Sequence, residues 1–363
     1  MSETAAALAL MALPGMTPAK LRMCWRTAGG FDALLDEVTP ALPASLQSLL
    51  ADAHNRPDRY REQGARRLED LVEQGIDVLV LGDEDYPALL GEIPQSPPVL
   101  YVRGSRACLA LPQLAIVGGR RASRGGLELA SAFAAELAAS GFIITSGLAL
   151  GIDGAAHRGA LRSGRTVAVV GTGLDTVYPR QHRTLQEQIL AEGGAVVSEL
   201  PPGAGVRPQH FPARNRIISG MSLGVLVIEA ALRSGSLITA RLALEQGREV
   251  FAIPGSIHST QVKGCHQLIR EGALLTESAA DIVEQLGGLL GYKAAEMSAV
   301  GDDTGSLGPE ARQLLELIGF DPVDMDTLAM QSGMAMPALS ALLVSLEIEG
   351  RVEARDGRYL RLR

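Results

Sequence analysis

Runs of consecutive apolar residues, each followed by a small-residue turn and then by helical spacing, fill the middle of this 363-residue chain. The runs read LAIVGG, FIITSG, TVAVVGTG, AVVSEL, GVLVIE and EVFAIPG. Unbroken Val/Ile/Leu runs indicate strands that are buried on both faces. Strands that alternate with helices predict a parallel sheet. We therefore predict an α/β fold, an extended Rossmann-like and mostly parallel sheet, in which IDVLVLG and VLYVRG start the domain or extend its sheet at one edge.

The regions on either side of this core have different patterns. Residues 1–75 alternate short helical patterns with Pro and Gly breakers, which predicts a small helical domain of the SAM or helix-hairpin-helix type. Residues 76–290 form the Rossmann-like domain, and the small, polar, aperiodic residues 291–308 read as a linker. Residues 309–363 predict three helices and a hairpin that turns at Asp356-Gly357, the layout of a winged helix.

The predicted winged helix lacks the positive charge expected of a domain that recognises duplex DNA. Its third helix, Met336–Gly350, contains no Lys or Arg. From Pro309 to the C-terminus nine acidic residues oppose six arginines, so the net charge is −3. A recognition helix without a cation would enter the phosphate field unaided. A protein-contact or packing role is therefore favoured for this domain, and reading of duplex DNA stays as the alternative.

Apolar runs and cysteines indicate the cellular compartment of the protein. No apolar run reaches the roughly 18–20 residues of a membrane span, and the apolar N-terminus lacks the basic start of a signal peptide. The scattered cysteines Cys24, Cys108 and Cys265 suit a reducing cytosol, so we expect a cytoplasmic protein. Cys265 lies between His258 and His266 in the sequence, but a fourth ligand is missing, so no metal or other cofactor is expected.

Charge is segregated along the chain, although its total is −8. Between Arg103 and Leu127 five arginines occur without an acidic residue, and the same is true of the arginines between Pro201 and Leu226. A basic patch inside an acidic total is compatible with nucleic-acid binding.

Glycine-rich turns follow several of the predicted strands. None matches the G-x-x-x-x-G-K-[ST] phosphate loop, and Gly171-Thr172-Gly173 lacks the third glycine of a dinucleotide fingerprint. Turns after parallel strands share one edge of the sheet, where glycines let backbone N–H groups approach an anion. We expect these turns to gather there: Gly118-Gly119-Arg120, Ser146-Gly147, Gly171-Thr172-Gly173, Ser234-Gly235-Ser236 and Pro254-Gly255.

Four arginines are expected at the same edge, each just after a strand or turn: Arg120, Arg180, Arg214 and Arg216. The last two lie in a short polar segment that leads into the strand Gly224–Ile228. Phe211 and Tyr178 lie beside these arginines, although aromatic residues make up only 4% of the chain. A basic groove with stacking rings is typical of single-strand binding. The alternative for each arginine is an internal salt bridge.

Candidate catalytic groups were also considered. Glu229, just past a strand, could act as a general base, but no nucleophile motif accompanies it. His157 is interpreted as a helix-packing or phosphate-facing residue, and Asp153 as a helix cap.

Taken in order, several motifs resemble the DNA-processing protein A family (DprA/Smf). They read AIVGGRRAS, ITSGLALGIDGAAHRGAL, VVGTGLDTVYPRQH, FPARNRIISGMS, VIEAALRSGSLITARLALEQGREVFAIPG and GCHQLIREGA. The resemblance implies a cytosolic bacterial homodimer that binds single-stranded DNA. It also implies that the protein protects incoming strands in natural transformation and loads a RecA-type recombinase onto them, without catalysis.

Residue by residue, the family's G-x-R motif falls on Gly118 and Arg120, and its basic residue after Tyr-Pro falls on Arg180. The family's R-N-R motif falls on Arg214, Asn215 and Arg216, and a dimer contact falls weakly on Leu268 and Ile269. Together with the turns, the expected strand-binding set is Gly118, Arg120, Ser146, Gly147, Gly171, Gly173, Arg180, Phe211, Arg214, Asn215, Arg216, Ser234, Gly235 and Ser236. The rivals are a phosphoribohydrolase-like enzyme, whose P-G-G-x-G-T-x-x-E signature is missing here, and a duplex-binding regulator.

Overall fold

The computed structural model describes residues 3–36, 39–287, 309–318, 323–348, 352–355 and 358–361. The chain divides into two compact units, Met1–Leu290 and Gly291–Arg363, which are considered separately. The predicted linker at 291–308 lies outside the described residues.

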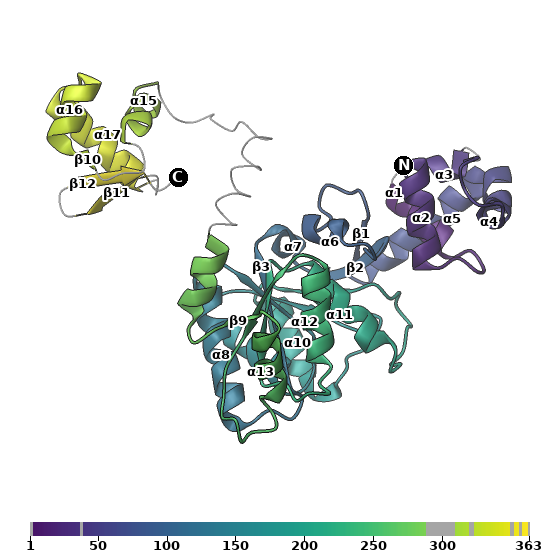
Figure 1. The fold of residues 1–363 in the computed structure, drawn as a ribbon. Coiled ribbons are helices and arrows are strands. Elements are labelled where there is room, and N and C mark those ends of the chain that lie inside the picture. Colours follow the sequence, from purple (N-terminus) through teal and green to yellow (C-terminus); the bar gives the residue numbers. More distant parts are fainter. Residues whose placement is uncertain are drawn as a thin grey trace. The chain divides into compact units, whose positions relative to one another are not determined.

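One long sheet organises the first unit, with the strand order β1-β2-β6-β5-β4-β3-β7-β8-β9 (Figure 1). The run from β6 to β9 is parallel, whereas β1 pairs antiparallel with β2, and β2 with β6. The first two strands therefore extend one edge of the sheet, as predicted. The strands are β1 (Asp77–Val80), β2 (Val99–Gly104), β3 (Gln113–Gly118), β4 (Ile143–Ser146), β5 (Thr166–Val169), β6 (Ala195–Ser198), β7 (Gly224–Ile228), β8 (Glu249–Ala252) and β9 (Leu274–Leu275).

Helices cover both faces of this sheet, because neighbouring residues of a strand point to opposite faces. Leu114 and Ile116 of β3 pack with α8 (Arg124–Ala139), α9 (Ile152–Ala160) and the helical residues 279–287. Ala115 and Val117 of the same strand belong to the other core. That core also takes residues from α10 (Arg183–Ala191), α11 (His210–Gly220), α12 (Ser236–Glu245) and α13 (Lys263–Arg270). The short elements are α6 (Ala88–Glu92), α7 (Ala107–Ala110) and the 3-10 helix η1 (Arg180–His182).

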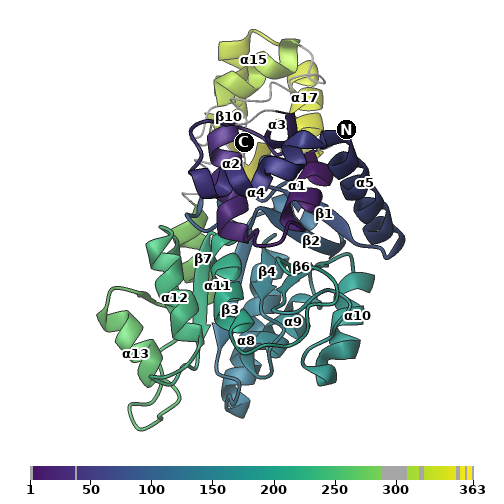
Figure 2. The same ribbon diagram turned by 90° about the vertical axis from the view of Figure 1, so that its right-hand side faces the viewer.

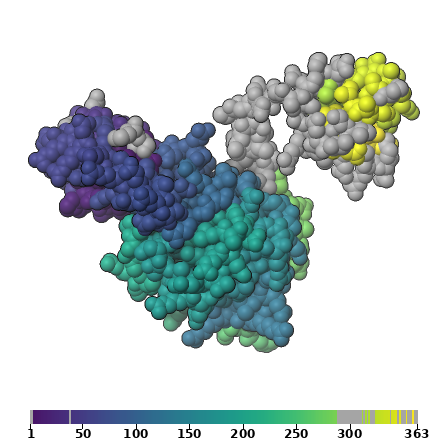
Figure 3. All heavy atoms as spheres, turned by 180° about the vertical axis from the view of Figure 1, so that it is seen from behind, coloured from purple at the N-terminus to yellow at the C-terminus, as the bar shows by residue number. Residues whose placement is uncertain are grey.

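The N-terminal helices pack on the antiparallel edge of the sheet. Leu10 and Leu71 belong to the same buried cluster as Leu79 of β1 and Leu100 of β2. In Figure 3 the purple N-terminal residues form a continuous surface with the blue and teal residues beside them. The separate domain boundary at residue 75 stays a prediction. These helices are α1 (Glu3–Met11), α2 (Pro18–Ala28), α3 (Ala33–Asp36), α4 (Ala44–Asn55) and α5 (Pro57–Glu73).

The second unit is a winged helix, as predicted. Its helices are α15 (Pro309–Ile318), α16 (Met325–Ser332) and α17 (Met336–Ile348), and its small sheet has the order β10-β12-β11. The strands are β10 (Val323–Asp324), β11 (Val352–Arg355) and β12 (Arg358–Arg361), of which β10 was not predicted. Leu314, Leu328, Leu343 and Val352 are buried in its core. The predicted Asp356-Gly357 turn lies outside the described residues.

Helix α11 was not predicted. The polar segment that contains Arg214 and Arg216 leads into β7, as expected, but its residues His210–Gly220 form this helix. Pro212 lies in the first turn of this helix. Proline lacks a backbone N–H group, but N–H groups in the first turn have no intrahelical acceptor, so Pro212 removes no helical hydrogen bond.

Candidate nucleic-acid interface

A pocket of about 710 Å³ opens at the carboxyl ends of β3 and β7. From β3 the chain continues through β4, β5 and β6 toward one edge of the sheet, whereas β7, β8 and β9 continue toward the other. Such a switch in strand order leaves a crevice between the two halves, which is the expected ligand site of an open α/β sheet. Gly118 and Glu229, at the ends of these two strands, both line the pocket.

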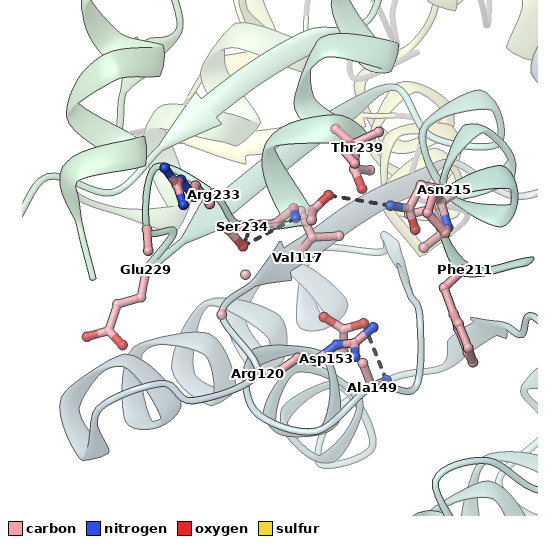
Figure 4. A pocket seen from close by; sticks show the side chains of 18 of the residues that line it. Val117, Arg120, Ala149, Asp153, Phe211, Asn215, Glu229, Arg233, Ser234 and Thr239 are labelled. Atoms are coloured by element: carbon pink, nitrogen blue, oxygen red, sulfur yellow. Dashed lines mark hydrogen bonds between the residues drawn. The ribbon is translucent and has the colours of Figure 1, made fainter. Parts of the chain in front are cut away.

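Three side chains form a stack at the mouth of the pocket. The guanidinium carbon of Arg120 lies 5.8 Å from the centre of the Phe211 ring, within the range of a cation–π contact. Tyr178, which is 41% exposed, packs against the same ring with a centroid distance of 5.3 Å. Gly171 lies on Phe211, and a Cβ there would be 3.2 Å from the ring. These contacts join the loop after β3 to α11 and to the segment before η1. Figure 4 shows Arg120 and Phe211 among the residues that line the pocket.

Arg214 forms part of the floor of the pocket and is buried. Its Nη1 donates to the Val169 carbonyl, and its Nε has no partner within the described residues. Burial lowers the pKa of Arg214 to about 10, partly offset by Asp153, so the guanidinium stays charged at neutral pH. Gly147 leaves room for this side chain, because a Cβ there would stand 2.0 Å from Nη1. The floor thus carries the positive charge of Arg214, and its Nε–H group has no partner in the described residues.

Asp153 lies beside this arginine in the first turn of α9. Burial raises the pKa of its carboxyl, although the Arg214 charge and two N–H groups act in the opposite direction. Its Oδ2 accepts from the N–H groups of Gly147 and Ala149, at 3.1 and 3.4 Å. The prediction of a helix cap was therefore wrong, since Asp153 orders the turn before the helix and Gly151 occupies the cap position.

The N-terminus of α12 forms the opposite wall. The hydroxyls of Ser234 and Ser236 lie 2.7 Å apart, and Asn215 donates to the Gly235 carbonyl from α11. Figure 4 shows Asn215 and Ser234 facing each other across this part of the pocket. Hydroxyl donors at a helix N-terminus favour an anion.

Glu229 is engaged in a structural role. Its carboxylate accepts from the backbone N–H and the hydroxyl of Ser123, the N-cap of α8, and the Ser123 hydroxyl in turn accepts from Gly126. A carboxylate at a helix N-terminus is stabilised by the helix dipole. The hypothesis that Glu229 is a free general base finds no support in this arrangement.

Arg216 does not reach the pocket, contrary to the prediction that it lies at the mouth. It forms a two-pronged ion pair with Glu199, at 2.6 and 2.8 Å, in which both side chains are at most 13% exposed. Its Nε also donates to the Gln95 carbonyl. The alternative reading of an internal salt bridge is the correct one for this residue.

Some of the predicted strand-binding residues line the pocket and some do not. Gly118, Arg120, Phe211, Arg214, Asn215, Ser234, Gly235 and Ser236 line the pocket. Ser146 is buried and donates to the Ile116 carbonyl, Gly173 packs on the Pro201 carbonyl, and Arg180 is exposed in η1, outside the pocket lining.

Arg121, Arg233, Thr239 and Gln261 also line the pocket, although they were not predicted. Arg121 and Arg233 directly flank predicted turns, so their position in the sequence could have identified them. Thr239 and Gln261 follow from packing and carried no such signal.

Five further residues that the sequence singled out lie outside the pocket lining. His157 is buried, and its Nδ1 lies 2.7 Å from the Thr166 hydroxyl, which supports its helix-packing interpretation. Cys265 is buried against the Val227 carbonyl, and His266 contacts the Gly255 carbonyl. Leu268, expected weakly at a dimer surface, is buried in the chain's own core, whereas Ile269 is half-buried. The burial of Leu268 removes it from any surface.

No group of three or more His, Cys, Asp or Glu side chains in the described residues is arranged to hold a metal ion. None of the described helices is both long enough and apolar enough to cross a membrane.

A doubly wound α/β sheet with an arginine-lined, aromatic-rimmed pocket at its switch point defines a Rossmann-like protein whose pocket is suited to an anionic ligand. Residues 77–287 match the family described as DNA recombination-mediator protein A, and residues 301–358 match the DprA winged helix domain. The chain therefore belongs to the DNA recombination-mediator protein A family.

Individual relatives agree with this assignment. Protein Smf of Escherichia coli (strain K12) is 44% identical over 77% of this chain and 76% of its own length. The X-ray structure of DNA processing protein A from Streptococcus pneumoniae superposes with a TM-score of 0.63 and 35% identity, over 78% of this chain and 98% of that one. A Helicobacter pylori DNA processing protein A, whose description concerns its single-stranded DNA binding mode, gives a TM-score of 0.53 and 29% identity. That match covers 58% of this chain and 95% of that one.

Proposed function

We propose that this protein binds single-stranded DNA in the pocket at the switch point. The observation that carries the proposal is the stack of Arg120, Phe211 and Tyr178 above a buried cationic floor. Aromatic faces accept bases of any sequence, and each stacked base contributes about 1–3 kcal/mol. The described binding mode of the Helicobacter pylori relative supports the same ligand.

Each wall of the pocket has a part in this binding. A base stacks on Phe211, and the exposed guanidinium of Arg120 contacts either the base or a phosphate. The hydroxyls of Ser234 and Ser236 donate to a phosphate at the N-terminus of α12. Arg214 adds a fixed positive field from below. Phosphates and unstacked bases are both needed to fill such a pocket, and a single strand offers both.

We further propose that the protein protects incoming strands in natural transformation and loads a RecA-type recombinase onto them. It acts in the cytoplasm as a homodimer. Membership of a recombination-mediator family supports this role. A strand held by its bases and backbone, and not cut, is a suitable substrate for transfer to a recombinase.

The carboxylates of the pocket fit a binding role without catalysis better than they fit an enzyme. Glu229 is held by Ser123, and Asp153 orders the turn at residues 147–149. A general base must be within reach of the proton that it removes, and both groups already accept hydrogen bonds from the chain.

The test compares two arginines of equal charge. Arg120→Gln removes the guanidinium from the stack at the mouth. Arg162→Gln changes an exposed arginine in the loop between α9 and β5, at the amino end of β5. By fluorescence anisotropy, Arg120→Gln should weaken binding of an oligo-dT strand and lower the salt slope by about 0.7 per lost phosphate contact. The Arg162 variant should bind as the unmodified protein does. Equal affinities for the two variants would contradict the proposal.

A further inference from the structure

Arginines gather at a second place, where α2 meets the core beside α11. Arg22 of α2 donates from Nη1 to the Ser96 carbonyl at 3.0 Å. Arg216 of α11 donates from Nε to the neighbouring Gln95 carbonyl at 2.9 Å. Two guanidinium groups from different parts of the chain therefore lie on adjacent peptide units.

Arg22, Arg26 and Arg216 place three positive charges close together here. Arg26 follows Arg22 by one helical turn, so both lie on the same face of α2, and Arg26 is exposed without an ion pair in the described part of the chain. Burial lowers the pKa of Arg22, and the nearby charges of Arg26 and Arg216 lower it further. Glu199 is already held by both prongs of Arg216.

Acidic residues also occur close to this cluster, in the loop after β1. Gly82 contacts Trp25 of α2, which brings residues 83–85 near. Asp83 accepts from the Val80 N–H group, and Asp85 is paired with Arg106. Only Asp85 is neutralised by an ion pair, and Glu84 between them is exposed without an ion pair in the described residues. Helix α2 itself contains no acid, so its charged residues are all basic.

The cluster and the pocket are connected by α11. Phe211 and Asn215 face the pocket, whereas Arg216 faces α2. Five residues of helix separate Phe211 from Arg216, a distance of about 7.5 Å along the axis at 1.5 Å per residue. In Figure 2, α2 lies above α11, consistent with the hydrogen bonds to residues 95 and 96. A strand that leaves the pocket along α11 would meet these arginines within a few nucleotides.

We propose that Arg22 and Arg26 form a second phosphate-contact site, which holds the backbone of the same single strand whose bases occupy the pocket. This inference rests on the proposed function and extends the strand's path onto the N-terminal helices. The contact is electrostatic and independent of sequence, because it involves phosphates alone.

The experiment varies strand length. Oligo-dT of about four nucleotides fills the pocket alone, and about twelve nucleotides reach α2, within the span that single-strand sites cover. Arg26→Gln should leave the affinity for the short strand unchanged. It should weaken the affinity for the long strand several-fold and lower the salt slope of long-strand binding by about 0.7. Arg59→Gln is the matched control, since Arg59 is exposed on α5 of the same region.

A double variant, Arg22→Gln with Arg26→Gln, should lose more long-strand affinity than Arg26→Gln alone, with thermal melting to confirm the fold. Equal long-strand affinity for the Arg26 and Arg59 variants would overturn the proposed second site, while the proposal that the pocket binds DNA would stand. Failure of the unmodified protein to bind either strand would instead overturn the proposed function.

Discussion

Gly147→Ala is the substitution whose effect follows most directly from the geometry of the pocket. The added Cβ would stand 2.0 Å from Arg214 Nη1 and 2.6 Å from Cζ. Arg214 is 5% exposed and its Nη1 is bound to the Val169 carbonyl. The guanidinium must therefore move, and the pocket that it lines offers space.

The cost has two parts. Overpacking in a filled interior costs about 1–3 kcal/mol. Loss of a charged hydrogen bond costs about 1.5–3 kcal/mol. A total of about 2.5–6 kcal/mol corresponds to a fall in Tm of about 5–12 °C for a unit of this size, at about 2 °C per kcal/mol. The displaced guanidinium would also occupy ligand space, so oligo-dT affinity should fall.

Thermal melting and anisotropy measure the two effects on the same sample. Gly205→Ala is the control, because nothing lies within 4 Å of a Cβ at that position. If Gly147→Ala melts at the same temperature as the control, Arg214 is not fixed as described, and the role given to Gly147 is wrong.

Three more predictions concern residues outside the binding contacts. Arg216→Ala leaves Glu199 without its partner, so urea unfolding should show a loss of about 3–5 kcal/mol, while short oligo-dT affinity of the folded protein is unchanged. A parallel loss of affinity would restore Arg216 to the binding site. Burial lowers the pKa of His157 to about 3, so the folded state binds fewer protons than the unfolded state below pH 6.5. Stability should therefore fall from about pH 6.5 toward pH 3, by up to about 1.4 kcal/mol per unit, and His157→Gln should flatten this slope in urea unfolding at about pH 7 and pH 5. A slope unaffected by the substitution would contradict the neutral imidazole. A chain ending at Gly287 should keep its oligo-dT affinity, because Met1–Leu290 is a compact unit of its own. Loss of binding by a folded truncated chain would give the winged helix a part in the strand contact.

The sheet could be predicted because its strands are buried on both faces and therefore read as unbroken apolar runs. LAIVGG and GVLVIE became β3 and β7, the two strands that create the switch point. The placement of the site at the carboxyl ends of the strands followed from the same pattern, whereas the reversal of strand order between β3 and β7 was not predicted.

The error at Arg216 has a simple geometric cause. Arg216 was expected at the pocket together with Arg214, but residues two apart on a helix point about 200° apart. On α11, Arg214 faces the pocket and Arg216 faces Glu199. The pairing with Glu199 depends on packing between segments 17 residues apart in the sequence, and local pattern does not show it.

Anisotropy of a labelled oligo-dT strand at two salt concentrations, with an equal-length duplex as competitor, tests the central claim most directly. The account predicts tight, salt-sensitive binding that the duplex does not displace and that Arg120→Gln weakens. Binding that the duplex displaces as readily as unlabelled oligo-dT, or no binding at all, would contradict it.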